Sequence, residues 1–557
     1  MQKSLKTLGR LWLDGDRWKL RCEPHVAMWA KRIFRRIPTG SHNVFELSHT
    51  PSVCRDLEWF SMRFPLEIDH LDELRTAADS HRDHIATLDQ IIDTDYVPRS
   101  YELALPPRDY QRRAADLYAA QRSLLLADEV GLGKTVSSLC SLTDERTVPA
   151  VVVCVPHLQR QWQREIETFL PDATTHIIKQ RKIYELPKTD GRGPDVVIVS
   201  YHKLSDWAEV LAQYGRSIIF DEVQELRRRG TDKYSGAKHI ASQEHMFRIG
   251  LSATPIYNFG GEIFNVMQIL FPDALGTEDE FIREWCCGYA GKARLKDPAA
   301  FGTWLRENHY MLRRTRKDVG RELEPLTRIT QPIDCDTAPL DDIKDAAGEL
   351  ARIILSQEKQ VDGNKMRAAE EFNVLLRQAT GIAKAPHVAA FVNMLLENGE
   401  KVVLYGWHRA VYKIWLSKLS HHNPQLYTGS ESVPQKQKSV ETFVSGESDL
   451  LIISLRSGAG LDGLQHVCRT VVFGELDWSP GVHEQDIGRV FRDGQTDPVT
   501  AYFLLSDGGV DPLMAETLGL KREQIDGIRG ESGGIAQRVS SDDGLRDLAK
   551  KYLNSNR

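Results

Sequence analysis

A glycine-rich loop between an apolar segment and a helix-forming segment constrains this fold more than any other feature of the sequence. The apolar run Ser123–Ala127 leads through the loop Asp128–Thr135 into a predicted helix at Val136–Leu142. Parallel strands need a crossover helix, and a strand that continues through such a loop into a helix is typical of them. The loop therefore predicts an α/β fold.

The same loop predicts a site for a nucleoside triphosphate. Gly131 and Gly133 let backbone N–H groups curl around phosphates, and the N-terminus of the next helix adds a favourable dipole. Lys134 can reach the outer phosphates, and the Thr135 hydroxyl can ligate Mg²⁺. Asp128 stands where the usual loop has its first glycine. A strand–helix turn without function is the alternative, but the order Gly-x-Gly-Lys-Thr disfavours it, so ATP and Mg²⁺ are the expected cofactors.

An acidic pair supplies the metal-holding group that the loop needs. The apolar run Ser217–Phe220 ends in Asp221 and Glu222. Asp221 at the strand tip is expected to hold magnesium, directly or through water, and Glu222 to orient and deprotonate the attacking water. Such a pair alone is usually a surface turn. Together with the upstream loop, it predicts catalysis.

Short apolar segments recur along the chain in two series. The first series comprises Ser123–Ala127, Ala150–Val155, Asp195–Ser200, Ser217–Phe220 and Phe247–Leu251. The second comprises Lys401–Tyr405, Gln425–Thr428, Leu450–Ser454, Thr470–Phe473 and Val499–Leu505. Each is mostly aliphatic and bounded by polar residues or glycine, as central strands of parallel sheets are. The sequence predicts two tandem parallel α/β sheets.

These patterns suggest a division of the chain into five parts. We expect an N-terminal α+β module at 1–104, a first lobe at 105–328, a helical protrusion or linker at 329–385, a second lobe at 386–525 and a tail at 526–557. In the module, strands are expected near Leu11–Leu13, Trp18–Arg21 and Val44–Leu47, and helices near Ala27–Phe34, Val53–Phe60 and Ile68–Ile92.

Composition excludes few classes of protein. The chain has 41% hydrophobic and 27% charged residues, and no run approaches the about 18 apolar residues of a membrane span. Its first residues lack a signal-peptide pattern, so a cytoplasmic location is expected, and the compact size of the chain favours a bacterial or phage-like setting. The 8 cysteines form no Cys-x-x-Cys pair, which disfavours zinc and redox sites. A net charge of −6 does not exclude a basic cleft, because binding depends on where Lys and Arg lie.

Further motifs stand in a fixed order around the loop and the acidic pair. They are Pro107–Gln111, Val155–Leu158 with Trp162, Ser200–His202, Leu251–Pro255 with Asn258, Ser454–Leu464, Glu475–Gly481 and Gln485–Gln495. In this order they resemble the motifs of Swi/Snf-type superfamily-2 helicase-like ATPases, over roughly Leu105 to Glu523. The resemblance implies two RecA-like lobes with helical insertions. It also implies an ATP hydrolase that tracks along double-stranded DNA.

The resemblance assigns roles to residues of the first lobe. Arg108 and Gln111 are expected at the nucleotide, where the Gln111 amide offers an adenine edge a paired donor and acceptor. Nucleic-acid contacts are expected from Pro156, Trp162, Ser200 and Tyr201. Coupling between the two sites is expected from Gln224, Ser252 and Thr254, although a histidine is usual at the position of Gln224.

It also assigns roles to the second lobe. Arg489 and Arg492 share one face of a predicted helix and are expected to meet the γ-phosphate across the cleft. Gln485 is expected to take part in coupling, and Ser454 and Arg456 in contacts to nucleic acid. A solvated arginine pair on an exposed helix is the alternative. Asp462 departs from the apolar residue that is more usual in its loop.

Three features favour the Swi/Snf branch over strand-separating helicases. A long segment separates Leu251–Pro255 from the second lobe, and Glu262–Phe271 with Pro272 and Met311–Val319 resemble the inter-lobe elements of the branch. Glu475–Gly481 is similar to a segment typical of the branch. Within the branch, Arg377–Lys384 followed by Lys401–Tyr405 resembles the annealing-helicase (HepA-related) subgroup, whose members rewind or remodel branched DNA. Double-stranded or branched DNA is therefore the expected partner, together with other DNA-processing proteins and without a membrane. A strand-separating DNA or RNA helicase and an inactive ATPase scaffold stay as alternatives.

The N-terminal module leaves two interpretations open. Its predicted helix from Ala27 to Arg36 places Arg32, Arg35 and Arg36 near one face. The module is either a substrate-recognition domain that presents this basic helix to DNA, or a packing domain with a solvated basic face.

Overall fold

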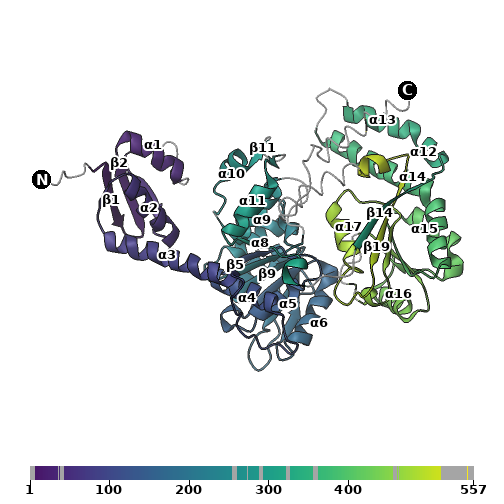
Figure 1. The fold of residues 1–557 in the computed structure, drawn as a ribbon, viewed down its shortest axis with the longest axis horizontal. Coiled ribbons are helices and arrows are strands. Elements are labelled where there is room, and N and C mark those ends of the chain that lie inside the picture. The colour runs from purple at the N-terminus through teal and green to yellow at the C-terminus, as the bar shows by residue number, and fades with distance from the viewer. Residues whose placement is uncertain are drawn as a thin grey trace.

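The computed structural model describes residues 7–34, 37, 43–253, 260–272, 274–287, 293–320, 326–355, 362–455, 461, 463–515 and 549. Several residues of the sequence analysis lie outside these ranges: Arg35, Arg36, Thr254, Asn258, Arg456, Asp462 and the segment 526–543. Figure 1 shows three bodies along the long axis: a small module in purple, a first lobe in blue to teal and a second lobe in green to yellow.

The N-terminal module is a four-stranded sheet in the order β3-β2-β1-β4, covered by helices. Its elements are β1 (Gly9–Asp14), β2 (Arg17–Cys22), α1 (Pro24–Ile33), β3 (Phe45–Ser48), α2 (Pro51–Arg63), β4 (Glu67–Ile68) and α3 (Leu71–Ile92). Trp18 and Leu20 alternate into a core with Phe60 of α2. The predicted strands and helices are all present. The connector helix begins later than predicted, because Ile68 belongs to β4 and His70 adopts a left-handed φ of 64°.

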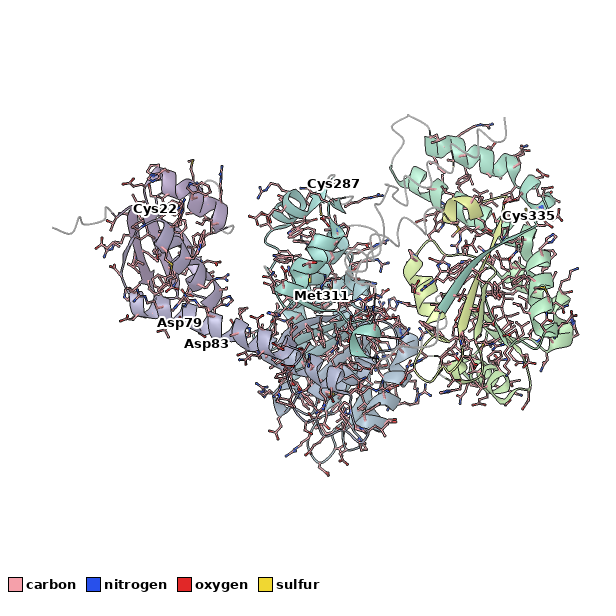
Figure 2. All side chains as sticks on the ribbon, in the orientation of Figure 1. Cys22, Asp79, Asp83, Cys287, Met311 and Cys335 are labelled. Carbon is pink, nitrogen blue, oxygen red and sulfur yellow. The ribbon has the colours of Figure 1, made fainter. Side chains whose placement is uncertain are left out.

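Helix α3 belongs to two hydrophobic cores. Leu74 and Ala78 in its first half pack in the core of the module. Leu88 and Ile91 in its second half pack in a core of the first lobe. Between them the helix surface is exposed, and Figure 2 labels Asp79 and Asp83 there. One continuous helix therefore joins the module to the lobe (Figure 1).

The first lobe is a seven-stranded parallel sheet in the order β13-β5-β10-β9-β6-β8-β7. Its strands are β5 (Ser123–Leu126), β6 (Ala150–Cys154), β7 (Thr175–Ile177), β8 (Val196–Ser200), β9 (Ser217–Asp221), β10 (Phe247–Leu251) and β13 (Met311–Leu312). Its helices are α4 (Asp109–Gln121), α5 (Lys134–Ser141), α6 (Gln159–Phe169), α7 (Leu204–Tyr214), α8 (Asp232–Ala241), α9 (Gly260–Leu270), α10 (Glu278–Trp285) and α11 (Pro298–Glu307). Val151 and Val153 of β6 pack in one core, and Val152 in another. Burial on both faces explains why its strands are continuous apolar runs.

Strand register brings the ends of three neighbouring strands together. Leu251 of β10 pairs with Leu126 of β5 on one side and with Asp221 of β9 on the other. The strands are parallel, so the segments that follow them leave the sheet at one edge. The glycine-rich loop and the acidic pair therefore meet there, as predicted.

The second lobe is a six-stranded parallel sheet in the order β14-β19-β18-β15-β17-β16. Its strands are β14 (Leu326–Ile333), β15 (Val402–Gly406), β16 (Gln425–Tyr427), β17 (Leu450–Ser454), β18 (Thr470–Phe473) and β19 (Val499–Ser506). Its helices are α12 (Ala338–Asp341), α13 (Lys344–Leu355), α14 (Asp362–Glu397), α15 (Arg409–Lys418), α16 (Val433–Ser445) and α17 (Pro480–Ile487). The predicted class, two tandem parallel-sheet lobes with helical insertions and a small α+β module, is confirmed.

Two elements cross the domain limits that the sequence suggested. Strand β14 pairs in parallel with β19 from Leu326 to Ile333, so a limit at 328 would cut an edge strand of the second sheet. Helix α14 continues past 385 to Glu397. The β14 residues are at most half-buried and lack the apolar run of a central strand, which is why the sequence did not reveal this strand.

Cysteines form no disulfide in the part of the chain that the structure describes. Figure 2 places Cys22, Cys287 and Cys335 in three different parts of the molecule. No group of three or more metal-ligating side chains occurs in the described ranges. Within the same ranges, no helix combines the length and the apolar character needed to cross a membrane.

Candidate functional site

The glycine-rich loop wraps the N-terminus of α5 and has little room for side chains. Gly131 and Gly133 adopt φ values of 90° and 72°, which favour glycine. A Cβ atom on Gly133 would lie 2.5 Å from Nε2 of Gln111. The Lys134 ammonium donates to the carbonyl of Asp128 at 2.8 Å and lies 3.4 Å from that of Glu129. The lysine therefore folds over its own loop, where a phosphate chain would compete for it.

A buried ion pair anchors the start of this loop. Asp128 is fully buried and accepts from Arg314 through its backbone N at 3.0 Å, its Nε at 3.1 Å and its Nη2 at 2.5 Å. Arg314 also donates to the carbonyl of Tyr110 and lies over its ring. The sequence analysis missed this pair. A buried carboxylate where a glycine is usual needs a cation, and Met311–Val319 carries several arginines, so a signal was present.

The acidic pair is held by two aromatic residues. Trp162 Nε1 donates to Asp221 Oδ2 at 2.8 Å, and the Tyr201 hydroxyl donates to the Asp221 carbonyl at 2.8 Å. Glu222 follows with a left-handed φ of 52°. A non-glycine residue in this region stores about 1–3 kcal/mol of strain, which is common at functional sites. At this left-handed turn the backbone leaves the extended conformation of β9, which ends at Asp221.

Burial shifts two pKa values in the site. Burial, with a smaller contribution from nearby Arg313, lowers the pKa of Lys134 to about 8, although the charges of Asp128 and Glu222 oppose this shift. Burial and the charge of Glu222 raise the pKa of Asp221, although the bond from Trp162 opposes this. Both shifts favour the uncharged form of the group. A phosphate chain beside Lys134 and a cation beside Asp221 would each restore the charge.

The two lobes face each other across a small cavity of about 100 Å³. It is lined by Thr135, Leu158, Gln161, Trp162, Glu165, Asp221 and Glu222 from the first lobe and by Arg489 from the second. Arg489 Nε is buried and has no hydrogen-bond partner among the described atoms. Arg489 of the second lobe therefore lines the same cavity as the acidic pair and Thr135 of the first lobe.

The predicted helical face for Arg489 and Arg492 is wrong. Helix α17 ends at Ile487, and both arginines lie in the turns that follow. Arg492 Nη1 lies 3.4 Å from the carbonyl of Leu461, and its Cβ would lie 3.5 Å from a Cβ on Gly131. The backbone of Arg492 therefore lies beside the glycine-rich loop, while Arg489 lines the cavity.

Three side chains connect the lobes at this site. Arg316 Nη2 donates to the carbonyls of Val130 at 2.6 Å and Phe491 at 2.8 Å. Arg108 pairs with Asp493 at 3.0 Å. Gln485 Nε2 lies 3.5 Å from Glu222 Oε2. The acidic pair and the loop are thus both in contact with the segment that carries the two arginines.

Comparison with protein families is decisive at this point. Residues 42–338 match the model of the SNF2-related domain, and residues 386–494 match that of the helicase conserved C-terminal domain. The chain belongs to the SNF2-related family. The match begins inside the N-terminal module and covers the first lobe, and the two domains together are those of an ATP-hydrolysing enzyme of the helicase class.

Individual SNF2-related proteins are similar over most of this chain. The DNA annealing helicase and endonuclease ZRANB3 of Mus musculus is 26% identical over 452 residues, 77% of this chain and 41% of its own length. The uncharacterized ATP-dependent helicase YqhH of Bacillus subtilis is 25% identical over 74% of this chain and 78% of its own. The Sulfolobus solfataricus SWI2/SNF2 ATPase core in complex with dsDNA is 19% identical, covers 82% of this chain and 98% of its own, and has a TM-score of 0.36. This chain spans about two fifths of the length of ZRANB3.

Both polar atoms of the Gln111 side chain, in the SNF2-related segment Pro107–Gln111, are hydrogen-bonded to backbone atoms of this chain. Gln111 Oε1 accepts from the backbone N of Arg108 at 2.9 Å, and its Nε2 donates to the carbonyl of Leu132 at 3.1 Å. The amide is therefore not free to read an adenine edge in this state. Its expected role and that of Arg108 at the nucleotide stay predictions.

Most predicted nucleic-acid contacts of the SNF2-related motifs do not face solvent. Trp162 is only 3% exposed and bonds to Asp221, while Ser200, Tyr201 and Ser454 are buried. In this structure these four side chains take part in packing or in support of the acidic pair, and their contacts to nucleic acid stay predictions. Pro156 is exposed, and Arg456 lies outside the described residues.

Two of the predicted coupling residues, Gln224 and Gln485, contact Glu222, and their role in coupling stays a prediction. The Gln224 amide donates to the Glu222 carboxylate, which Gln485 approaches from the second lobe. Ser252 is buried at the end of β10, between the two site strands. Gln224, Glu222 and Gln485 form a polar chain between the lobes. Thr254 is not among the described residues.

Proposed function

We propose that this chain is an ATP-driven translocase that tracks on double-stranded DNA and remodels branched DNA or protein–DNA complexes without lasting strand separation. The observation that supports it most is the split site: Thr135, Asp221 and Glu222 on the first lobe share one cavity with Arg489 of the second. A site divided in this way responds to hydrolysis by moving one lobe against the other.

The residues present fit ATP with Mg²⁺. Lys134 would hold the outer phosphates in exchange for the loop carbonyls it now contacts. Thr135 and Asp221 would hold the metal. Burial and Glu222 raise the pKa of Asp221, and a cation beside this carboxylate would favour its charged form. The metal would neutralise charge that develops on the phosphates.

Within this site, Glu222 would orient a water molecule and accept its proton, while Gln224 and Gln485 hold the carboxylate. Arg489 and Arg492 would approach the γ-phosphate from the second lobe and stabilise its charge. Attraction between these arginines and the γ-phosphate would hold the lobes together before hydrolysis. Hydrolysis would remove this attraction, so that the two lobes would bind and release the nucleic acid in turn.

DNA as the partner rests on the family and on relatives such as ZRANB3, described as a DNA annealing helicase. Contacts that track a strand touch phosphates rather than base edges, so we expect little sequence specificity and a steep dependence on salt. An inactive scaffold is disfavoured because Lys134, Asp221, Glu222 and Arg489 are all present at one site. A cytoplasmic, bacterial or phage setting belongs to the same proposal, and the relative from Bacillus subtilis supports its bacterial part.

The N-terminal module is proposed to recognise branched or single-stranded DNA. Helix α1 exposes Met28 and Trp29, and α2 exposes Trp59 and Met62. The Arg32 guanidinium lies 5.4 Å from the centre of the Trp29 ring. Aromatic rings beside basic groups are the surface on which unpaired bases stack. Other proteins of DNA processing remain candidate partners of the same surface.

ATPase assays on duplex, forked and single-stranded DNA and on RNA test the proposal, with Lys134→Ala as the inactive control. Duplex and forked DNA should stimulate turnover, and added salt should weaken binding with a log–log slope near −0.9 per phosphate contact. Stimulation by RNA alone, or lasting separation of a plain duplex, would instead support an unwinding helicase.

A further inference from the structure

Arg316 lies in the segment after β13 and contacts both lobes. It is only 7% exposed. A guanidinium in such a place needs partners for its charge and its donors. Those partners come from both lobes.

The first lobe fixes Arg316 at three points. Its backbone N donates to Glu129 Oε2 at 2.8 Å, and its Nη1 lies 3.2 Å from Glu129 Oε1. Its Nη2 donates to the carbonyl of Val130 at 2.6 Å. A Cβ atom on Gly131 would lie 3.1 Å from the same nitrogen. Arg316 is therefore part of the outer wall of the glycine-rich loop.

The second lobe rests on the same guanidinium. Nη2 donates to the carbonyl of Phe491 at 2.8 Å, and the Phe491 ring centre lies 4.4 Å from the guanidinium carbon. Phe491 directly precedes Arg492 and follows the Arg489 turn. Since α17 has already ended, no helix holds these arginines in place. Their position relative to the phosphate loop depends on contacts such as this one.

We infer that Arg316 is a positioning residue that sets the segment 489–492 against the glycine-rich loop, so that it acts on hydrolysis through Arg492. This inference rests on the proposed function. Arg316 contacts the Val130 carbonyl of the loop and is not among the residues that line the cavity, so its effect should fall on the rate of hydrolysis more than on nucleotide affinity. The planar guanidinium can lie flat on the Phe491 ring while its Nη2 donates to both carbonyls, and the compact, strongly hydrated ammonium of lysine lacks this planar surface.

Arg316→Ala and Arg316→Lys test the inference, with Lys317→Ala, an exposed neighbour in the same loop, as the matched control. At saturating duplex DNA, kcat should fall about tenfold or more in both Arg316 variants, while nucleotide affinity changes less than about threefold. The control should match wild type. A loss of affinity without a loss of kcat, or full activity of Arg316→Lys, would overturn the inference.

A double substitution decides whether Arg316 acts through Arg492. Arg492→Ala alone should lower kcat about a hundredfold or more. In Arg316→Ala/Arg492→Ala, the further loss should stay within about threefold of Arg492→Ala alone, because a misplaced arginine has little left to contribute. Losses that multiply would show that the two residues act independently, against the inference.

A third variant covers the case in which Arg316→Ala does not fold. Phe491→Leu keeps the carbonyl and the apolar volume but removes the ring under the guanidinium, and should lower kcat by about threefold or more with nucleotide affinity unchanged. Unchanged kcat in this variant counts against the inference. The proposed function fails separately, namely if the wild-type chain shows no DNA-stimulated ATPase at all.

Discussion

Two aromatic residues of the site support the acidic pair, although their motifs are expected to contact nucleic acid. Trp162 and Tyr201 belong to motifs expected at nucleic acid, yet both hold Asp221 in place. A buried indole donor and a phenol donor fix the carboxylate and the carbonyl of one residue. Substitutions at these positions should therefore act on Asp221, the residue proposed to hold the metal.

Glu222→Gln should bind ATP and hydrolyse it at least about 100-fold more slowly, because the amide cannot take the proton of the attacking water. The left-handed turn and the contacts to Gln224 and Gln485 can persist, since an amide oxygen also accepts hydrogen bonds. Single-turnover hydrolysis and nucleotide binding measure the two effects. Turnover near that of wild type would show that another group is the base.

Asp221→Asn should raise the melting temperature of the nucleotide-free protein at neutral and alkaline pH. The folded-state pKa of Asp221 lies above its unfolded value, so the folded state holds the proton that the unfolded state releases. Stability of the wild type therefore falls as pH rises from the ordinary carboxyl pKa through the raised one. The variant lacks this loss.

Melting curves at pH 5 and pH 8, without Mg²⁺ or ATP, check this prediction. The gain of Asp221→Asn over wild type should be larger at pH 8 than at pH 5. Equal gains at both values, or destabilisation at pH 8, would contradict the assigned pKa direction. Loss of metal-dependent ATPase should accompany the gain in stability.

At the scale of elements, central strands and local loops were predictable, and edges and cross-lobe contacts were not. The runs that form β6 and β17 are buried on both faces, so their sequences are continuous and apolar. The half-buried edge strand β14 lacks that signal. The contact of Arg316 with Phe491 joins residues 175 positions apart, and no periodicity or spacing marks such a pair. The arginine segment was predicted by order along the chain, but the end of α17 was not.

A buried ion pair attaches α14 to the end of β19. Lys384 Nζ lies 2.6 Å from Asp511 Oδ2 and donates to the carbonyl of Leu504 at 2.8 Å. Asp511 also accepts from the backbone N of Ser506 at 3.0 Å. Lys384→Met should lower the free energy of unfolding by about 3–5 kcal/mol, because it leaves a buried carboxylate unpaired.

Denaturant unfolding of the second lobe measures this loss, and Lys384→Met/Asp511→Leu is the matched control. Removing both charges should restore a large part of the stability. A single variant as stable as wild type would mean that water reaches Asp511. Because both residues lie outside the nucleotide site, the ATPase of folded protein should change little.

At the scale of the molecule, the N-terminal module should set the preferred DNA structure while the lobes set the motor activity. Trp29→Ala combined with Arg32→Ala should weaken binding to forked DNA roughly fivefold or more, through lost stacking and charge. Duplex-stimulated ATPase should stay close to wild type. Arg75→Ala, an exposed arginine on α3, serves as the control.

Competition between forked and plain duplex DNA measures that preference. An unchanged preference in the double variant would favour a module that only packs. Substitution is a sharper test than removal of residues 1–100, because Leu88 and Ile91 of α3 fill the core of the first lobe. Removing them would damage the lobe itself.

Because its two ends pack in different hydrophobic cores, α3 is a rigid link between the N-terminal module and the first lobe. Its 22 residues span roughly 33 Å at the rise of an α-helix, and bending it would expose apolar surface at both ends. The module must then follow every rotation of the first lobe, with a displacement that grows with its distance from the cleft. A small closing rotation between the lobes would therefore produce a large displacement of the exposed face of α1. DNA bound at this face, as proposed for the module, would therefore move with the first lobe when the lobes close.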